Sequence, residues 1–277
     1  MAEIGKYNNL QIVKILDFGA YIDGGDKGEI LLPIRQVPPN LDVDDFIEVF
    51  IYNDSEDRII ATSHEPFAIA GEFALLKAIG VNKFGAFMDW GLEKDLLVPF
   101  REQRETMQEG RWYLVYIYLD EQSQRLAASA KLDRFLNKTE PEFEENQEVD
   151  LIIRKKTDLG YTAIINNTHL GLLYDNEIFQ ELRIGQKLKG FVKQIREDDK
   201  IDLSLNKIGY EFIDEFSETI LEKLKLQNNF ISITDKSSPE DIYSSFSMSK
   251  KNFKKAVGSL YKKRLIAIEE KGIRFIG

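Results

Sequence analysis

The stretch that decides the fold of this chain reads Lys83-Phe84-Gly85-Ala86-Phe87-Met88-Asp89. An earlier copy reads Asp17-Phe18-Gly19-Ala20-Tyr21-Ile22-Asp23, and a fainter later copy reads Asp158-Leu159-Gly160-Tyr161-Thr162-Ala163-Ile164. The glycines of successive copies are 66 and then 75 positions apart. A spacing above the roughly 20–50 residues of a solenoid repeat indicates a small domain copied in tandem. We therefore expect three similar domains.

Alternating apolar residues predict five short strands in each copy. In the first copy the expected strands are residues 10–16, 20–22, 29–32, 46–52 and 58–62. In the second they are residues 74–81, 84–88, 96–98, 112–119 and 125–129, and the third copy runs from residue 149 to 205. Five short strands joined by small turns are typical of the OB fold, a partly open Greek-key barrel.

After residue 207 the apolar period changes from two to about 3.6, which predicts helices. The first helix should bury one face, made of Phe212, Ile213, Phe216, Ile220, Leu221 and Leu224. Ser238-Pro239-Glu240-Asp241 is a helix start, and Ser249 caps a further helix, 250–263. That helix should point Phe253, Val257, Leu260 and Tyr261 inward. A hairpin turning at Lys271-Gly272 completes the pattern of a winged helix.

The predicted fold class is therefore mainly β with an α+β tail: three tandem five-stranded OB-fold barrels followed by a winged-helix domain. The predicted domains are 1–66, 71–137, 146–207 and 210–277.

The composition excludes several functional classes. The chain has no cysteine, so disulfides and thiolate metal sites are excluded. No apolar run reaches the roughly 20 residues of a membrane span, and the N-terminus lacks a signal pattern, so we expect a cytoplasmic protein without membrane contact. The net charge is −10, from segments of −8 (1–70), 0 (71–139), −4 (140–207) and +2 (208–277). Acid is concentrated at the front and base at the back.

The Phe-Gly-Ala-aromatic cassette, followed by a strand ending in Leu-Leu-Pro or Leu-Val-Pro, resembles the RNA-binding OB repeat of ribosomal protein S-one. With the tail segments 235–242 and 248–262, the chain resembles the conserved virulence factor B family of bacterial RNA-binding regulators over essentially its whole length. This resemblance implies that aromatic side chains on strands two and three stack RNA bases. It assigns that role to Phe18 and Tyr21 in the first unit, Phe84 and Phe87 in the second, and Tyr161 and Tyr174 in the third. The histidine common at the end of strand three is replaced by Pro33, Pro99 and Tyr174.

Strand geometry qualifies these assignments. Two aromatics three positions apart in one strand point to opposite faces, so one of each pair should lie in the core. The acidic charge of the first unit opposes phosphate binding. We interpret that unit as a spacer, a dimer surface or a degenerate domain, and Phe18 and Tyr21 as its weaker candidates.

Basic residues gather in the third unit and the winged helix. In the third unit the candidates for RNA binding are Lys155, Lys187, Lys189, Lys193 and Arg196, of which Lys187 and Lys189 share one strand face. In the winged helix they are Lys250, Lys251, Lys254, Lys255, Lys262 and Lys263, on the element that enters a groove in such domains. The alternative is an ordinary solvated surface. The hypothesis is that the third unit and the winged helix form the main RNA-binding surface.

The sequence contains no catalytic constellation of residues. His64 and His169, the only histidines, fall in different units, and Asp42-Val43-Asp44-Asp45 lacks the glycine and glutamate of a calcium loop. We expect no metal site and no cofactor. The sequence therefore predicts a non-enzymatic bacterial protein that binds single-stranded RNA and acts in post-transcriptional regulation. The alternatives are a DNA-binding winged-helix regulator and a protein-interaction scaffold on the translation machinery. Homodimer formation and ribosome association stay open.

Overall fold

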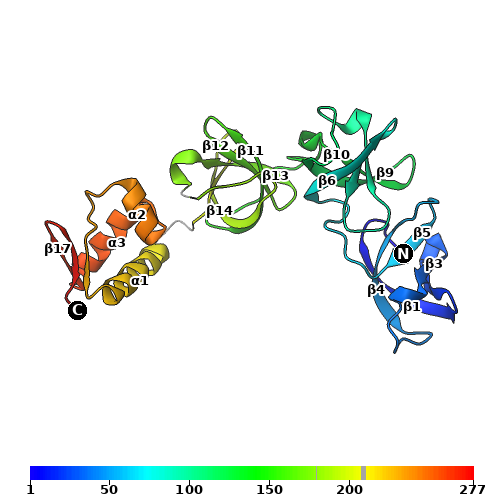
Figure 1. The fold of residues 1–277 in the computed structure, drawn as a ribbon, viewed down its shortest axis with the longest axis horizontal. Coiled ribbons are helices and arrows are strands. Elements are labelled where there is room, and N and C mark those ends of the chain that lie inside the picture. The colour runs from blue at the N-terminus through cyan, green and yellow to red at the C-terminus, as the bar shows by residue number, and fades with distance from the viewer. Residues whose placement is uncertain (179, 207–209) are drawn as a thin grey trace. The chain divides into compact units, whose positions relative to one another are not determined.

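Figure 1 labels the helices and strands of the chain in a computed structural model, which describes residues 1–178, 180–206 and 210–277. The side chains of residues 210–215 lie outside the described part. The elements fall into two compact units, Met1–Lys138 and Thr139–Gly277. The first holds two β-sheets, and the second holds one β-sheet followed by a helical domain with a small sheet. The expected class, mainly β with a C-terminal winged helix, is confirmed.

Five strands form the first barrel: β1 (Tyr7–Leu16), β2 (Gly19–Asp23), β3 (Glu29–Pro33), β4 (Phe46–Asn53) and β5 (Ile59–Thr62). They close in the order β1-β2-β3-β5-β4, with β3 and β5 parallel. Alternate side chains point inward, so Ile12, Ile22 and Leu32 are fully buried. The side chains between them in each strand point outward, where they can contact other parts of the chain or a ligand.

Five strands also form the second sheet: β6 (Phe73–Asn82), β7 (Gly85–Asp89), β8 (Leu96–Pro99), β9 (Trp112–Asp120) and β10 (Arg125–Ser129). Their order is β10-β9-β6-β7-β8, and within the described residues no backbone pairing joins β8 to β10. Glu102, just after β8, bridges this seam. Its carboxylate accepts a hydrogen bond from Ser129 Oγ (2.7 Å) and its carbonyl accepts one from Ala130 N (2.9 Å). The second unit is thus a half-open barrel joined at the seam by one buried acidic residue.

The third barrel repeats the first in strand order, β11-β12-β13-β15-β14. Its strands are β11 (Glu148–Thr157), β12 (Gly160–Ile165), β13 (His169–Tyr174), β14 (Lys187–Ile195) and β15 (Ile201–Ser204). Leu151, Ile153 and Val192 lie in its core. Two of the three predicted barrels are therefore closed.

The glycine of the repeated cassette is required by backbone crowding. A Cβ atom on Gly85 would lie 2.2 Å from the carbonyl oxygen of Val98, and one on Gly160 would lie 2.0 Å from that of Leu173. Both glycines also have positive φ, +153° and +140°. Only glycine permits the second strand of the barrel to approach the third this closely.

The first two barrels share apolar packing inside their unit. Phe50 and Tyr52 on β4 contact Trp90 of the second barrel, with ring centroids 5.8 and 6.4 Å apart. Phe50 and Trp90 are 0% and 2% exposed, and both belong to the core cluster that contains Leu96 and Val98. The outer face of β4 is thus an internal interface.

The C-terminal domain is built from α1 (Tyr210–Leu226), β16 (Phe230–Ile231), α2 (Pro239–Phe246), α3 (Lys250–Lys262), β17 (Ile266–Glu269) and β18 (Gly272–Phe275). Ser238 Oγ accepts from Asp241 N and Ser249 Oγ accepts from Asn252 N, which confirms both predicted caps. β18 lies between β16 and β17 in the small sheet.

The C-terminal hairpin and the orientation of Tyr261 differ from the predictions. Glu269 pairs with Gly272, so the hairpin turn lies one residue before the predicted position. Tyr261 is 57% exposed, so its predicted inward orientation is wrong. Phe212 and Ile213 lie outside the described side chains.

In the described residues, no helix combines the length and apolar character needed to cross a membrane.

Candidate nucleic-acid interface

The first aromatic of each cassette lies in the turn that joins the first two strands of its barrel. Phe18 and Phe84 precede β2 and β7 and are 55% and 60% exposed. The side chain of Asn82 accepts a hydrogen bond from Phe84 N (2.8 Å) and fixes the second of these turns. Leu159 takes the same place in the third barrel. These side chains stand free of the barrel cores.

The second aromatic faces outward from its strand. Ala86 and Met88 on β7 are fully buried, while Phe87 between them is partly exposed, and Tyr21 has the same arrangement on β2. The rings of Phe18 and Tyr21 meet edge to face at 6.1 Å. The prediction that one aromatic of each pair lies in the core is therefore wrong. The prediction assumed that both aromatics of a pair lie in the same strand, whereas the first aromatic lies in the turn before that strand.

A third outward position follows strand three and was missed in the sequence. The backbone N–H of Ile34, Phe100 and Asp175 donates to the carbonyl of Phe18, Phe84 and Leu159, respectively. Phe100 is 47% exposed. In the second barrel, Phe84 in the turn, Phe100 bonded to it through the backbone and Phe87 on the adjoining strand β7 are here called the aromatic rim. The signal that would have found Phe100 is its place directly after the proline that ends the strand.

In the third barrel the aromatic positions are displaced. Tyr161 pairs with Lys156 and Leu173, which is the register position of the buried Ala20 and Ala86 in the other units. Tyr161 packs against the barrel core, with Lys156 Nζ 5.5 Å from its ring centroid. The outward position belongs to Thr162. Tyr161, predicted to stack a base, is thus only partly exposed and lies one register position away from the outward aromatics of the other units.

Tyr174 lies in a hydrogen-bonded network on the outer face of the third barrel. Its hydroxyl donates to Asp202 Oδ1 (3.3 Å) and accepts from Arg196 Nη2. Arg196 Nη2 and Gln194 Nε2 also donate to the buried Asp202 carboxylate, both at 2.7 Å. Burial alone would raise the pKa of Asp202, but the hydrogen bonds from Arg196, Gln194 and Tyr174 lower it. The hydrogen bond to Asp202 raises the pKa of Arg196 in turn. The guanidinium group of Arg196 is therefore already hydrogen-bonded to Asp202 and Tyr174 of its own barrel.

Other lysines predicted to bind RNA in the third barrel are also paired. Lys189 Nζ lies 2.8 Å from Asp150, and its hydrogen bond to that residue raises the pKa of Lys189. Lys193 Nζ lies 2.6 Å from Glu177. Lys155 and Lys187 are exposed, and their ammonium groups have no ion pair with a described residue. The predicted basic surface therefore keeps two unpaired lysines in this barrel.

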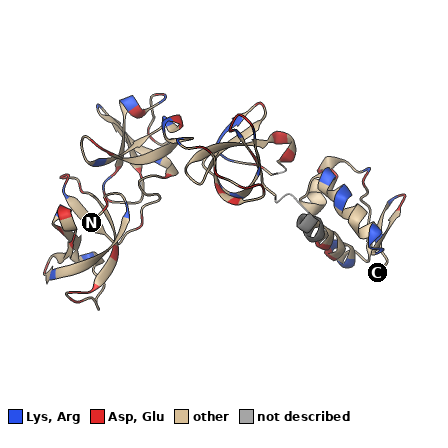
Figure 2. Cartoon of the chain, turned by 180° about the vertical axis from the view of Figure 1, so that it is seen from behind, with Lys and Arg blue, Asp and Glu red and all other residues tan. Residues whose placement is uncertain are grey.

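The exposed face of α3 carries the densest basic surface of the C-terminal domain (Figure 2). Phe253, Val257 and Leu260 are buried, and opposite them lies a basic face made of Lys251, Lys254, Lys255, Tyr261 and Lys262, with Gly258 at its centre. Lys254 is 3.7 Å from Asp235, while Lys251, Lys255 and Lys262 have no ion pair in the described part of the chain.

The two remaining predicted lysines differ. Lys250 Nζ donates to Ser237 O (2.8 Å), away from the centre of this face, and Lys263 follows the helix as its exposed C-cap.

The histidines do not form a site. His169 is buried, with its ring nitrogens 3.0 Å from Thr168 Oγ1 and 2.9 Å from Thr139 O, and its ring contacts Phe143. His64 is exposed in the other unit. Within the described residues, no group of three or more acidic, histidine or cysteine residues is arranged to hold a metal ion. The role of His169 is to join the segment before β11 to its barrel.

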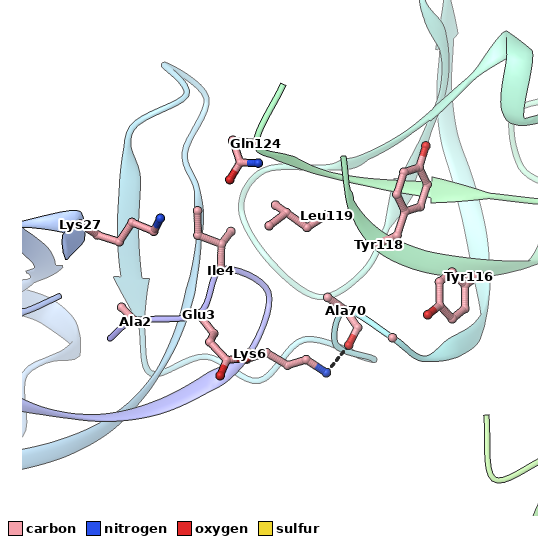
Figure 3. A pocket seen from close by; sticks show the side chains of 11 residues that line it. Ala2, Glu3, Ile4, Lys6, Lys27, Ala70, Tyr116, Tyr118, Leu119 and Gln124 are labelled. Carbon is pink, nitrogen blue, oxygen red and sulfur yellow. Dashed lines mark hydrogen bonds between the residues drawn. The ribbon is translucent and has the colours of Figure 1, made fainter. Parts of the chain in front are cut away.

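A hollow of about 400 Å³ lies in the first unit, where the N-terminal segment meets β9 (Figure 3). Ala2, Glu3 and Ile4 form one side of it, and Tyr116 and Tyr118 belong to the other. Lys6 Nζ donates to the carbonyl oxygen of Ala70 at its edge. Both lysines that line the hollow have a partner, since Lys6 is bound to this carbonyl and Lys27 lies 3.4 Å from Asp26, so the hollow offers no unpaired cation to a ligand.

Comparison with known proteins agrees with this architecture. The S1 domain model matches residues 4–64, and the model of the CvfB-like winged helix domain matches residues 218–275. The chain is 28% identical to the uncharacterized protein YitL of Bacillus subtilis, across 93% of this chain and 89% of that protein. It is 26% identical to conserved virulence factor B of Staphylococcus aureus, across 96% of this chain and 92% of the relative.

Among solved structures, a multidomain protein with nucleic acid binding domains from Streptococcus pneumoniae matches 99% of this chain and 98% of its own, with 25% identity and a TM-score of 0.42. S1 and winged-helix domains are nucleic-acid-binding types of domain. The two family models bear out the resemblance seen in the sequence: the chain carries an S1 domain and a CvfB-like winged helix domain, and it is similar over most of its length to the conserved virulence factor B proteins.

Proposed function

We propose that this protein binds single-stranded RNA and acts, without catalysis, as a post-transcriptional regulator in the cytoplasm. The observation that carries the proposal is the aromatic rim, which consists of the exposed rings of Phe84 and Phe100 and the partly exposed ring of Phe87, at the place where the family resemblance puts base stacking. Unpaired bases offer their faces to such rings, and each stacked base contributes roughly 1–3 kcal/mol. Bases inside a duplex are already stacked on one another, so the rim favours single strands.

The basic face of α3 supplies phosphate contacts in this proposal. Its lysines are exposed, and three of them have no ion pair among the described residues. A lysine that is free of a carboxylate can replace the counterions of a phosphate without first breaking a bond of the protein. The third barrel adds Lys155 and Lys187, while Lys189, Lys193 and Arg196 would have to exchange partners. A bound protein of this kind regulates by changing the access of other factors to the RNA.

Fluorescence anisotropy of a labelled single-stranded RNA tests the proposal on the full chain across salt concentrations. Phe84→Ala with Phe87→Ala should weaken binding by about tenfold or more, because two stacking rings are lost. Lys254→Glu with Lys255→Glu should weaken binding and reduce the salt slope by about 0.7 for each lost phosphate contact.

The control is Lys27→Glu with Lys200→Glu, an equal change of net charge on exposed turns of the first and third barrels. It should bind nearly as wild type does. Wild-type affinity in both test variants would contradict the proposal.

A second candidate function is duplex DNA binding, because the basic face belongs to the helix that enters the major groove in winged-helix proteins. A matched duplex DNA in the same titration separates the two. Tighter binding to the duplex that depends on Lys254 and Lys255, but not on the aromatic rim, would favour the DNA candidate.

A further inference from the structure

Gly80 on β6 is a glycine that the fold does not require. A Cβ atom built on it would meet no heavy atom within 4 Å, and its φ lies outside the positive range that favours glycine. Among the glycines whose surroundings are described, only Gly258 shares both properties. Glycine inside a strand weakens it, since the backbone is freer when unfolded and no side chain packs. The absence of a side chain at Gly80 therefore matters mainly for the outer surface of the sheet, where a ligand can approach.

The other two barrels show that a lysine fits at this place. Gly80 stands at a β-bulge and pairs with Phe87 of the aromatic rim. In the first barrel the same bulge position is Lys14, which pairs with Tyr21, and in the third it is Lys155, which pairs with Thr162. Residues paired across antiparallel strands share one face of the sheet. Gly80 thus occupies a position at which the first and third barrels carry a lysine.

In the first barrel that lysine covers the outward ring. Lys14 Nζ lies 4.5 Å from the ring centroid of Tyr21 and is held there by Glu29. Tyr21 also meets the edge of Phe18. Phe87 has no corresponding ring or cation contact with a described residue. Gly80 has no side chain to cover the ring of Phe87, whereas Lys14 at the same position covers the ring of Tyr21.

We propose that Gly80 makes the second barrel the unit that stacks RNA bases, by leaving the face of Phe87 free for a base. The inference rests on the proposed RNA binding and adds a residue that decides which of the similar barrels takes part. The base lies over Phe87 in the space that Lys14 fills in the first barrel.

The test is Gly80→Lys in the full chain, titrated against a short fluorescein-labelled single-stranded RNA. An added lysine normally strengthens nucleic-acid binding. Here the new side chain should cover Phe87 as Lys14 covers Tyr21, and affinity should fall by about fivefold to tenfold, the loss expected for one stacked base. A decrease caused by an added positive charge has no simple electrostatic explanation.

The matched control is Val81→Lys, which adds the same charge one residue further along β6. The third barrel has a lysine, Lys156, at this register position, so the backbone accepts it. Val81→Lys should bind RNA as tightly as wild type or more tightly. Equal weakening by both lysines would overturn the proposal.

Phe87→Ala separates failure of the inference from failure of the proposed function. If Phe87→Ala weakens binding and Gly80→Lys does not, Gly80 is no determinant, although the barrel binds RNA. If Phe87→Ala leaves the affinity for RNA unchanged, no base stacks on this ring, and both the proposed stacking and the inference about Gly80 are wrong. Thermal melting should show that Gly80→Lys is at least as stable as wild type, so that lost binding is not lost folding.

Discussion

Gly85 illustrates how one backbone position fixes a whole barrel. Replacement by alanine would push a Cβ atom to 2.2 Å from Val98 O at a φ of +153°, so strands β7 and β8 would have to separate. Gly85→Ala should therefore lower the free energy of unfolding by about 2 kcal/mol or more. Chemical denaturation of the purified protein measures this change. A variant that unfolds at the wild-type denaturant concentration would show that the crowding is relieved at no cost.

Asp202 gives the third barrel a pH dependence. Its folded-state pKa is lowered by the donors around it, so its charge stabilises the barrel above the pKa of an unfolded aspartate, about 3.9, and this contribution is lost as pH falls through the folded-state pKa. Asp202→Asn should be less stable at neutral pH, and its melting temperature should fall less steeply below about pH 4. Asp175→Asn, at an exposed carboxyl of the same barrel, is the control. Parallel melting curves for wild type and Asp202→Asn would contradict the prediction.

The sequence predicted the outward aromatics only where the cassette is intact. Phe87 and Tyr21 follow Gly-Ala and face outward, whereas Tyr161 follows the glycine directly and turns inward, because a shift of one residue in a strand changes the face. The exposure of Phe100 depends on a turn that the apolar pattern does not describe. The ion pairs of Lys189 and Lys193 join residues far apart in the sequence, so only the folded barrel reveals them.

Helix α3 has a favourable N-cap, Ser249, but a destabilising glycine in its interior. Gly258 lies in the middle of the helix, where glycine costs about 1 kcal/mol relative to alanine, and nothing crowds the place of its missing Cβ. Gly258→Ala should therefore stabilise the C-terminal domain by about 1 kcal/mol. A rise in its melting temperature, followed by the helical circular dichroism signal, is the expected result. A fall would indicate a steric contact that the free chain does not show.

Elements were the most predictable level of this structure. Strands and helices followed from apolar periods of two and 3.6, and the caps at Ser238 and Ser249 followed from side chains that can accept a backbone hydrogen bond. The seam of the second barrel did not follow. It depends on Glu102, whose buried carboxylate contacts Ser129 and Arg134 near the other edge of the sheet. Such a contact has no local signature in the sequence.

At the scale of the molecule, the first two barrels should unfold together, because Phe50 packs against Trp90. Phe50→Ala should remove about 3–5 kcal/mol of stability. The only tryptophans, Trp90 and Trp112, lie in the second barrel, so their fluorescence reports that barrel. A change on β4 should shift the tryptophan unfolding transition.

Phe46→Ala is the matched control, since Phe46 lies on the same strand and is 62% exposed. It should leave that transition near its wild-type position. If Phe50→Ala leaves the tryptophan signal unshifted, the barrels unfold independently.

The close approach at the cassette glycine also bears on how such a chain can diversify. The barrel requires the glycine and the small or apolar side chains that point inward, while it places little demand on the outward positions beside them. Duplicated copies could therefore acquire different surfaces without losing their shared framework. One copy now carries a tyrosine under a lysine, another carries three phenylalanines that are exposed or partly exposed, and the third carries a hydrogen-bonded network around an aspartate. Tandem repetition thus allows one barrel framework to carry three different outer surfaces.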